Sequence, residues 1–282
     1  MTDMRRRTLL GGALAVGAGI TATAARAQSL SSNLPPSNAP QVNPDAEALQ
    51  KALQGYDDKG TLEVVPVGQD WANLHRYRAA NSELMKMTPN PLRTVMMGDS
   101  ITDNWPGLSG NFFTANSLVG RGIGGQTTAQ MVLRFTPDVI RLKPRVVHIL
   151  AGTNDIAENQ DPYDPVMTTN NLQTMISLAK ANGIKVIMGS VPPATSFAWK
   201  PKASNPHDKI IALNKWILAT CEAQGLIYVD YWSVLVGPDG GLKPELGLDS
   251  VHPNAAGYAV MAPLTLAAID KYLGARTELI SK

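Results

Sequence analysis

The sequence contains a single cysteine, Cys221, among its 282 residues. One cysteine cannot form an internal disulfide, so a small scaffold held together by disulfides is excluded. Cys221 lies in a helix-like apolar pattern at 209–225, KIIALNKWILATCEAQG. We interpret it as a small buried apolar residue rather than a nucleophile.

Histidine is also scarce, with four residues in the chain. His148 lies inside the apolar run RVVHIL and is predicted to be a core residue, whereas His75 and His207 lie in polar surroundings typical of a surface. No group of His, Cys, Asp and Glu residues has the spacing of a metal site. The sequence therefore predicts no metal.

The chain lacks a strong excess of charge, because 25 Lys and Arg face 23 Asp and Glu, for a formal net charge of +2. Residues 1–27 carry four of the arginines and one aspartate, which leaves 21 basic and 22 acidic residues and a net charge of −1 for the remainder. We therefore expect no basic surface that would attract nucleic acid or an anionic membrane.

Residues 1–27 have the pattern of a signal peptide: a basic start at 5–7, an apolar Gly/Ala-rich stretch, and Ala-Arg-Ala at the end. The pair Arg6-Arg7 followed by Thr-Leu-Leu indicates the twin-arginine export route. The apolar stretch is short and weakly hydrophobic for a membrane-spanning helix. We predict an exported protein, periplasmic or secreted, with no stable membrane insertion after signal removal; an uncleaved N-terminal anchor is the alternative.

Two segments separate the signal from the main domain. Residues 28–45 are rich in Ser, Pro and Asn and are predicted to be a flexible lead-in. Residues 46–91 are predicted to be a helical extension, with one helix at about 45–54 and a clearer one at about 70–86. Asp70 is a candidate cap for the second helix, whose apolar face is expected to pack on the main domain.

In the main domain, predicted over 92–276, short apolar runs alternate with helical patterns, and no repeat or composition break indicates a further domain. Runs that are apolar on both faces, separated by helices, are typical of a parallel sheet covered by helices. The sequence thus predicts an α/β fold. The predicted strands are 92–98, 117–120, 145–150, 184–190 and 226–230, and the predicted helices are 127–135, 164–183, 207–225 and 254–274.

Three of the predicted strands end in small and polar residues. The first ends MMGDS and places Ser100 at a strand-to-helix junction; a role of Asp99 or Ser100 in capping the helix is the alternative. The second ends VGRGIGGQTT, whose glycines leave backbone N–H groups free to hold an oxyanion; a phosphate-binding loop is a weaker alternative, because no P-loop lysine follows. The third ends AGTND, where Asn154 offers a side-chain N–H and Asp155 can cap or support the loop.

A fourth segment, LGLDSVHPNAAGY, places Asp249 and His252 three residues apart just before the last predicted helix. A carboxylate at this spacing can accept a hydrogen bond from the imidazole, which fixes the tautomer and makes the other ring nitrogen a base. A turn aspartate and a surface histidine are the alternative. All four segments can meet along one edge of the sheet.

In this order, the four segments resemble the sequence blocks of the SGNH hydrolases, also called the GDSL esterase and lipase superfamily, over about residues 92–272. The resemblance implies a three-layer α/β/α sandwich, flavodoxin-like, with five parallel strands, and acyl transfer without metal or organic cofactor. It implies a triad of Ser100, Asp249 and His252, and an oxyanion hole formed by Ser100, Gly125 and Asn154. Many members have an asparagine where this chain has Gly120, which places a supporting contact in doubt.

The substrate is less specified by the sequence. Export and the loop at 190–207, which carries Phe197 and Trp199, favour acetyl esters of carbohydrates as substrates. Within the family, the sequence resembles exported acetylesterases and platelet-activating-factor acetylhydrolase-like members. Phe197, Trp199 and Trp105 are candidate substrate-binding residues, with packing in the core as the alternative for each. Lysophospholipase, thioesterase or aryl esterase activity is the enzymatic alternative. The non-enzymatic alternative is a carbohydrate-binding protein without hydrolytic activity. The oligomeric state is not indicated.

Overall fold

The computed structural model describes residues 70–87 and 93–274. The predicted signal segment, the lead-in at 28–45 and the predicted helix at about 45–54 lie outside these residues. Within them, no helix is both long and apolar enough to cross a membrane.

Five parallel strands form the central sheet, in the order β2-β1-β3-β4-β5. β1 and β3, at the centre, are buried along their whole length, which explains why their sequences are apolar on both faces. All five predicted strands are confirmed, with ends shifted by one or two residues. They are β1 (Thr94–Gly98), β2 (Leu118–Gly122), β3 (Val146–Leu150), β4 (Lys185–Gly189) and β5 (Ile227–Val229).

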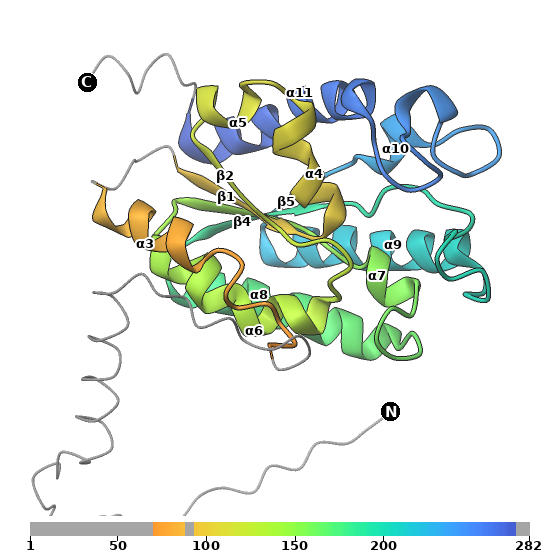
Figure 1. Ribbon diagram of the computed structural model, residues 1–282, viewed down its shortest axis with the longest axis horizontal. Coiled ribbons are helices and arrows are strands. Elements are labelled where there is room, and N and C mark those ends of the chain that lie inside the picture. Colours follow the sequence, from red (N-terminus) through yellow and green to blue (C-terminus); the bar gives the residue numbers. More distant parts are fainter. Residues whose placement is uncertain (1–69, 88–92, 275–282) are drawn as a thin grey trace, which may run out of the picture. The chain divides into compact units, whose positions relative to one another are not determined.

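Helices cover both faces of the sheet, so the fold is the three-layer sandwich that the sequence predicted (Figure 1). On one face lie α4 (Ser100–Leu108), α5 (Phe112–Ala115), α10 (Trp232–Leu235) and α11 (Ala255–Leu273). On the other lie α3 (Arg78–Lys86), α6 (Thr128–Asp138), α8 (Pro165–Ala181) and α9 (Pro206–Gln224). The short elements are η1 (Ile140–Leu142), α7 (Thr153–Ile156) and η2 (Pro244–Leu246).

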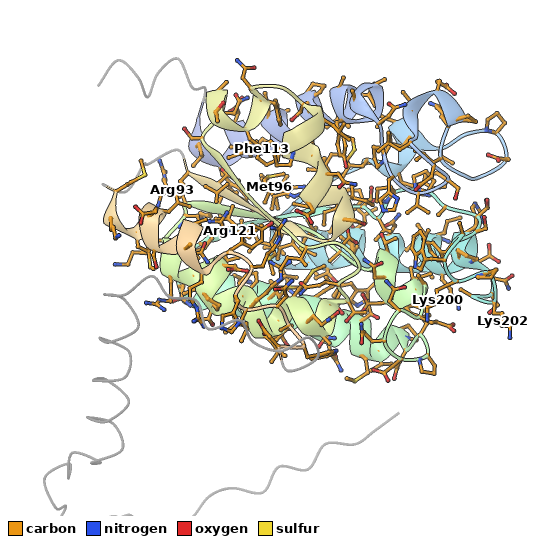
Figure 2. The ribbon with its side chains drawn as sticks, viewed as in Figure 1. Arg93, Met96, Phe113, Arg121, Lys200 and Lys202 are labelled. Atoms are coloured by element: carbon orange, nitrogen blue, oxygen red, sulfur yellow. The ribbon has the colours of Figure 1, made fainter. Side chains whose placement is uncertain are left out.

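Alternate side chains of each strand enter separate cores on the two faces. Met96 packs with Phe113 and α11 on one side, as Figure 2 shows, and the next residue, Met97, packs with Phe135 of α6 on the other. Each core contains more than a dozen buried apolar side chains, so both helix layers are held to the sheet mainly by hydrophobic burial.

The predicted helix at 70–86 is only partly correct, because α3 begins at Arg78 and residues 71–77 form turns. Asn73 has a left-handed backbone, with φ of 53°, which a helix does not allow. Asp70 does not cap α3, since its carboxylate accepts the backbone N–H of His75 instead. As predicted, α3 packs on the main domain, against α6 and η1.

Candidate active site

The turn after β1 presents Ser100 at the start of α4. A Cβ atom at Gly98 would overlap the side chain of Thr102 and the Leu150 carbonyl, so only glycine fits this close approach of strand and helix. Asp99 is the N-cap of α4, and its Oδ1 accepts the N–H of Ile101 at 3.0 Å. The capping role and the placement of Ser100 therefore belong to neighbouring residues of one turn.

Ser100, His252 and Asp249 form a continuous hydrogen-bonded chain. The Ser100 Oγ lies 2.9 Å from His252 Nε2, and His252 Nδ1 lies 2.8 Å from Asp249 Oδ2. The other Asp249 oxygen accepts the backbone N–H groups of Val251 and His252 at 2.8 and 2.7 Å. The carboxylate is thus held in one orientation by its own turn.

This chain of contacts sets the protonation of the Asp249 carboxyl. Partial burial raises its pKa, but the hydrogen bonds from the His252 backbone, the His252 ring and Val251 outweigh burial, and the pKa lies below the usual value. An ionised Asp249 requires a proton on Nδ1 of His252. The Nε2 lone pair then faces the Ser100 hydroxyl.

The strand register brings two further predicted residues to the same edge of the sheet. Gly98 of β1 is paired with Gly122 of β2 and with Leu150 of β3. Gly125 and Asn154 follow those partners by three and four residues, just as Ser100 follows Gly98 by two. Parallel strands end at a common edge, so the three loops are neighbours.

Gly125 and Asn154 differ in how they are held. Gly125 has a left-handed backbone, with φ of +78°, and is exposed in the loop between β2 and α6. The Asn154 side chain is buried, at 2% exposure, and its Nδ2 donates to the Gln126 carbonyl at 3.1 Å and to Asp99 Oδ2 at 3.4 Å. Burial raises the pKa of the Asp99 carboxyl to about 6. The amide of Asn154 is a fixed, neutral donor.

Asp155 supports the loop that carries Asn154, as predicted. Its carboxylate accepts the backbone N–H and the hydroxyl of Thr128 at 3.0 and 2.5 Å, and the hydroxyl of Thr168 at 3.3 Å. Thr128 is the first residue of α6, and Thr168 lies in the first turn of α8. One carboxylate therefore joins the loop after β3 to the starts of two helices.

Asn159 is a residue of the site that the sequence analysis missed. Its Nδ2 donates to Asn154 Oδ1 at 2.7 Å and to the Gly125 carbonyl at 3.1 Å, so it contacts two of the three predicted oxyanion residues. Its Oδ1 accepts the indole N–H of Trp199 at 2.8 Å. An asparagine five positions after Asn154 carries no signal by itself, because only the fold brings these partners together.

Of the three aromatic residues predicted to bind substrate, only Trp199 lies at the site. Its side chain is 41% exposed, and its ring centroid lies 5.9 Å from that of His252. The prediction was wrong for the other two, which are fully buried. Trp105 stacks on Tyr258 in one core, and Phe197 packs into the other core beneath Trp199, so neither can reach a bound molecule.

The remaining histidines and Cys221 lie away from the candidate active site. His148 is buried in β3, bonded to the Tyr231 hydroxyl at 2.8 Å, and burial lowers its pKa to about 3. Cys221 is buried, and burial raises its thiol pKa to about 12, as expected for an inert apolar residue. His75 pairs with Asp70, and His207 with Asp208. No His, Cys, Asp and Glu group within 70–87 and 93–274 is arranged to hold a metal.

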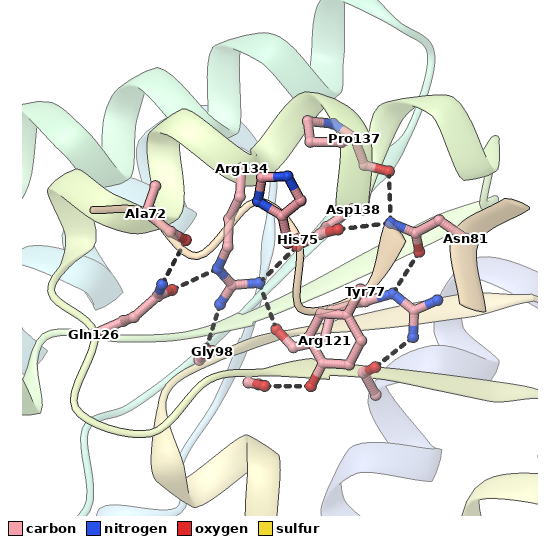
Figure 3. Close-up of polar contacts among 12 residues, drawn as sticks. Ala72, His75, Tyr77, Asn81, Gly98, Arg121, Gln126, Arg134, Pro137 and Asp138 are labelled. Atoms are coloured by element: carbon pink, nitrogen blue, oxygen red, sulfur yellow. Dashed lines mark hydrogen bonds and ion pairs between the residues drawn. The ribbon is translucent and has the colours of Figure 1, made fainter. Parts of the chain in front are cut away.

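A buried guanidinium connects the loops of the site (Figure 3). The Arg134 side chain, at 0% exposure, donates to the Gly98 carbonyl at 2.8 Å, to the Arg121 carbonyl at 2.9 Å and to Gln126 Oε1 at 2.5 Å. It also forms an ion pair with Asp138 at 3.1 Å. Gly98 precedes the Ser100 turn and Gln126 follows Gly125, so this one side chain fixes both loops.

Comparison with known proteins identifies relatives of this arrangement. The model of the GDSL-like lipase/acylhydrolase family matches residues 96–260, which includes all four segments discussed above. A crystal structure of an assigned acylhydrolase from Bacteroides fragilis is 45% identical, with a TM-score of 0.71, and the match covers 73% of this chain and 99% of the other.

Two curated relatives are longer than the region they share with this chain. A multidomain esterase of Ruminococcus flavefaciens is 25% identical over 173 residues, which are 61% of this chain and 21% of that protein. An uncharacterised lipoprotein of Bacillus subtilis is 37% identical over an alignment of 151 positions, which covers 46% of this chain and 61% of that protein.

Proposed function

We propose that this chain, which belongs to the GDSL-like lipase/acylhydrolase family, is a carboxylic ester hydrolase, namely a serine esterase that removes acetyl groups from carbohydrates. The observation that carries the serine mechanism is the unbroken contact chain from Ser100 Oγ through His252 to Asp249. A nucleophile, a base and a group that orients the base are what this mechanism needs.

In the proposed reaction, His252 Nε2 takes the proton of the Ser100 hydroxyl as Oγ attacks the ester carbonyl. The same nitrogen then gives the proton to the leaving alcohol, and an acyl-serine remains. Water, deprotonated by His252, attacks the acyl-serine, and the proton returns to Ser100 as the acid leaves. Asp249 keeps the ring in one tautomer and stabilises the imidazolium, without itself taking the proton.

The oxyanion formed in each step is proposed to accept the backbone N–H groups of Ser100 and Gly125 and the Asn154 amide. Fixed donors of this kind stabilise the transition state because they need no reorganisation when charge develops. Asn154 suits the role because it is neutral, and Asn159 and the Gln126 carbonyl hold its two ends. The second amide proton makes only the long 3.4 Å contact to Asp99, and it is the one proposed to donate to the oxyanion.

We expect Asn154→Ala to lower kcat by roughly 10²–10³ with little change in KM, because an oxyanion donor acts mainly in the transition state. Steady-state kinetics on an aryl acetate would measure this, and a thermal unfolding curve would show whether the variant is folded. Asn154→Asp, which keeps the shape but replaces the donor with a charge, serves as the companion variant. A raised KM with unchanged kcat would instead place Asn154 in substrate binding.

The carbohydrate part of the proposal rests on Trp199. Its exposed ring lies beside His252, and its N–H is fixed by Asn159, so one face is available to a substrate at low entropic cost. The apolar C–H face of a sugar ring packs well on an indole, and its hydroxyls suit polar neighbours such as Asn159. Export and a carbohydrate substrate together favour acetyl as the acyl group.

Trp199→Ala is expected to raise KM for an acetylated oligosaccharide by about tenfold more than for a small aryl acetate, since only the larger substrate uses the ring face. Trp199→Phe keeps a ring but loses the N–H to Asn159, and should retain most of the affinity. Equal losses on both substrates for Trp199→Ala would mean that the residue supports the loop. Equal losses for the Phe and Ala variants would assign the effect to the hydrogen bond.

Wild-type selectivity tests the substrate class directly. Activity should fall steeply from acetyl to octanoyl aryl esters, and acetylated oligosaccharides should release acetate faster than phospholipids release fatty acid. A preference for octanoyl esters would favour lysophospholipase, thioesterase or aryl esterase activity. Sugar binding without turnover of any short ester would favour the carbohydrate-binding protein without hydrolytic activity.

Export remains part of the proposal and rests on residues 1–27, with a periplasmic or secreted location as its consequence. The B. subtilis relative named as a lipoprotein agrees with an exported protein, although it shares only part of its length with this chain. Fractionation of cells that express the full chain, with mass determination of the N-terminus, would locate the protein and show whether Ala27 precedes a cleavage site.

A further inference from the structure

The turns at 71–77 run alongside the loop that carries Gly125. The Gln126 side chain donates to the Ala72 carbonyl at 2.7 Å, and Gln130 donates to the Trp71 carbonyl at 2.7 Å. At the other end, the Tyr77 hydroxyl donates to the Gly122 carbonyl. Anchors therefore lie on both sides of Gly125, and this part of the N-terminal extension borders the active site.

Trp71 is the aromatic residue that this border presents to solvent. Its side chain is 47% exposed, yet its indole N–H donates to Gln160 Oε1 at 3.1 Å and its carbonyl is held by Gln130. A large ring that is both exposed and fixed offers contact area with little entropy left to lose on binding.

Trp71 and Trp199 are held by consecutive residues of one loop. Trp199 donates its N–H to Asn159, and Trp71 donates its N–H to Gln160. Asn159 also contacts Gly125 and Asn154. The two exposed rings therefore both contact the loop that carries Asn159 and Gln160, next to the oxyanion residues, and Trp199 also lies beside His252.

We propose that Trp71 is a second aromatic platform, which binds a sugar unit of an oligosaccharide at a distance from the acetyl ester. This rests on the proposed function in that it takes a carbohydrate as the substrate. Trp199 receives the unit nearest the ester, and Trp71 receives one further along the chain. The platform exists only because residues 71–77 are built onto the hydrolase domain, so the extension contributes to specificity.

The polar surroundings favour a sugar over a lipid as the occupant. Arg76, on the same segment, contacts Asp103 at 3.4 Å, and Gln160 lies against the indole of Trp71 itself. These groups are hydrogen-bond partners for hydroxyls beside an apolar ring face, the combination that fixes the orientation of a carbohydrate. The acyl region of a lipid would remove water from Arg76 and Gln160 and offer them no hydrogen bonds in exchange.

Binding is best measured without turnover, in a Ser100→Ala background, by isothermal titration calorimetry with partly acetylated xylohexaose and partly acetylated methyl xyloside. Adding Trp71→Ala should raise Kd for the hexamer by about tenfold more than for the monomer. Trp71→Phe, which keeps a ring, should raise it only about twofold. Leu133→Ala, which removes a 55% exposed apolar side chain on α6, is the matched control and should change neither Kd.

The outcomes separate this inference from the proposed function. If the wild type deacetylates the hexamer in preference to the monomer but Trp71→Ala leaves the ratio of their Kd values unchanged, only the Trp71 platform is wrong. If the wild type hydrolyses aryl acetates but neither binds nor deacetylates the hexamer, the proposed carbohydrate substrate is wrong, and so is the Trp71 platform that depends on it. Binding of the Ser100→Ala protein to phosphatidylcholine vesicles, lost on Trp71→Ala, would assign the ring to a lipid surface.

Discussion

Ser100→Ala is expected to lose at least about four orders of magnitude in kcat on an aryl acetate, because removing a serine nucleophile leaves only binding and oxyanion stabilisation. Among the residues that the structure describes, the Ser100 hydroxyl is hydrogen-bonded to the side chain of His252. When the Ser100 hydroxyl is removed, Asp249 still holds the imidazole of His252, so the fold and the rest of the site should persist. Stopped-flow or steady-state release of the aryl alcohol measures the loss.

Two controls make this result interpretable. The thermal unfolding midpoint of Ser100→Ala should lie within a few degrees of the wild type, since a partly exposed hydroxyl contributes little to stability. His252→Ala should lose activity to a similar extent, and the double variant should lose little more, because residues that act as a unit are strongly non-additive. A Ser100→Ala protein that kept most of its turnover would eliminate the acyl-serine mechanism.

The sheet was predictable because its strands are buried on both faces. An apolar run such as residues 146–150 is typical of a strand covered on both faces, and the helix patterns between the runs give the parallel connections. The start of α3 was not predictable in the same way. The left-handed Asn73 and the contact of Asp70 with His75 replace the first helical turns, and neither is evident from apolar spacing.

At the site, the sequence located the groups that stand directly after strands, because the topology of parallel sheets requires strand ends to meet. It did not locate partners that only three-dimensional packing supplies. Asn159 and Trp71 act through contacts to residues far away in the sequence or on other loops. Trp105 and Phe197 were misjudged for the converse reason, since a tryptophan or phenylalanine in a loop or at a helix end has no sequence feature that separates a platform from a core residue.

Arg134→Met is expected to lower the free energy of unfolding by about 3–5 kcal/mol, the usual cost of removing one partner of a buried ion pair. Asp138 would remain almost fully buried without its ion-pair partner, with the Asn81 amide still donating to it at 2.7 Å. The carbonyls of Gly98 and Arg121 would also lose a donor. Urea denaturation followed by tryptophan fluorescence, at a pH near 7, measures the change.

Two comparisons assign the effect of Arg134→Met to the buried network. Lys86→Ala, which removes an exposed pair with Glu83, should cost less than about 1 kcal/mol. The double variant Arg134→Met, Asp138→Leu should recover part of the lost stability, because it removes the unpaired carboxylate as well. At temperatures where Arg134→Met is still folded, kcat should be reduced too. Arg134 holds Gly98, which precedes the Ser100 turn, and Gln126, which follows Gly125. A variant as stable as the wild type, with unchanged kcat, would show that hydrophobic burial alone fixes these loops.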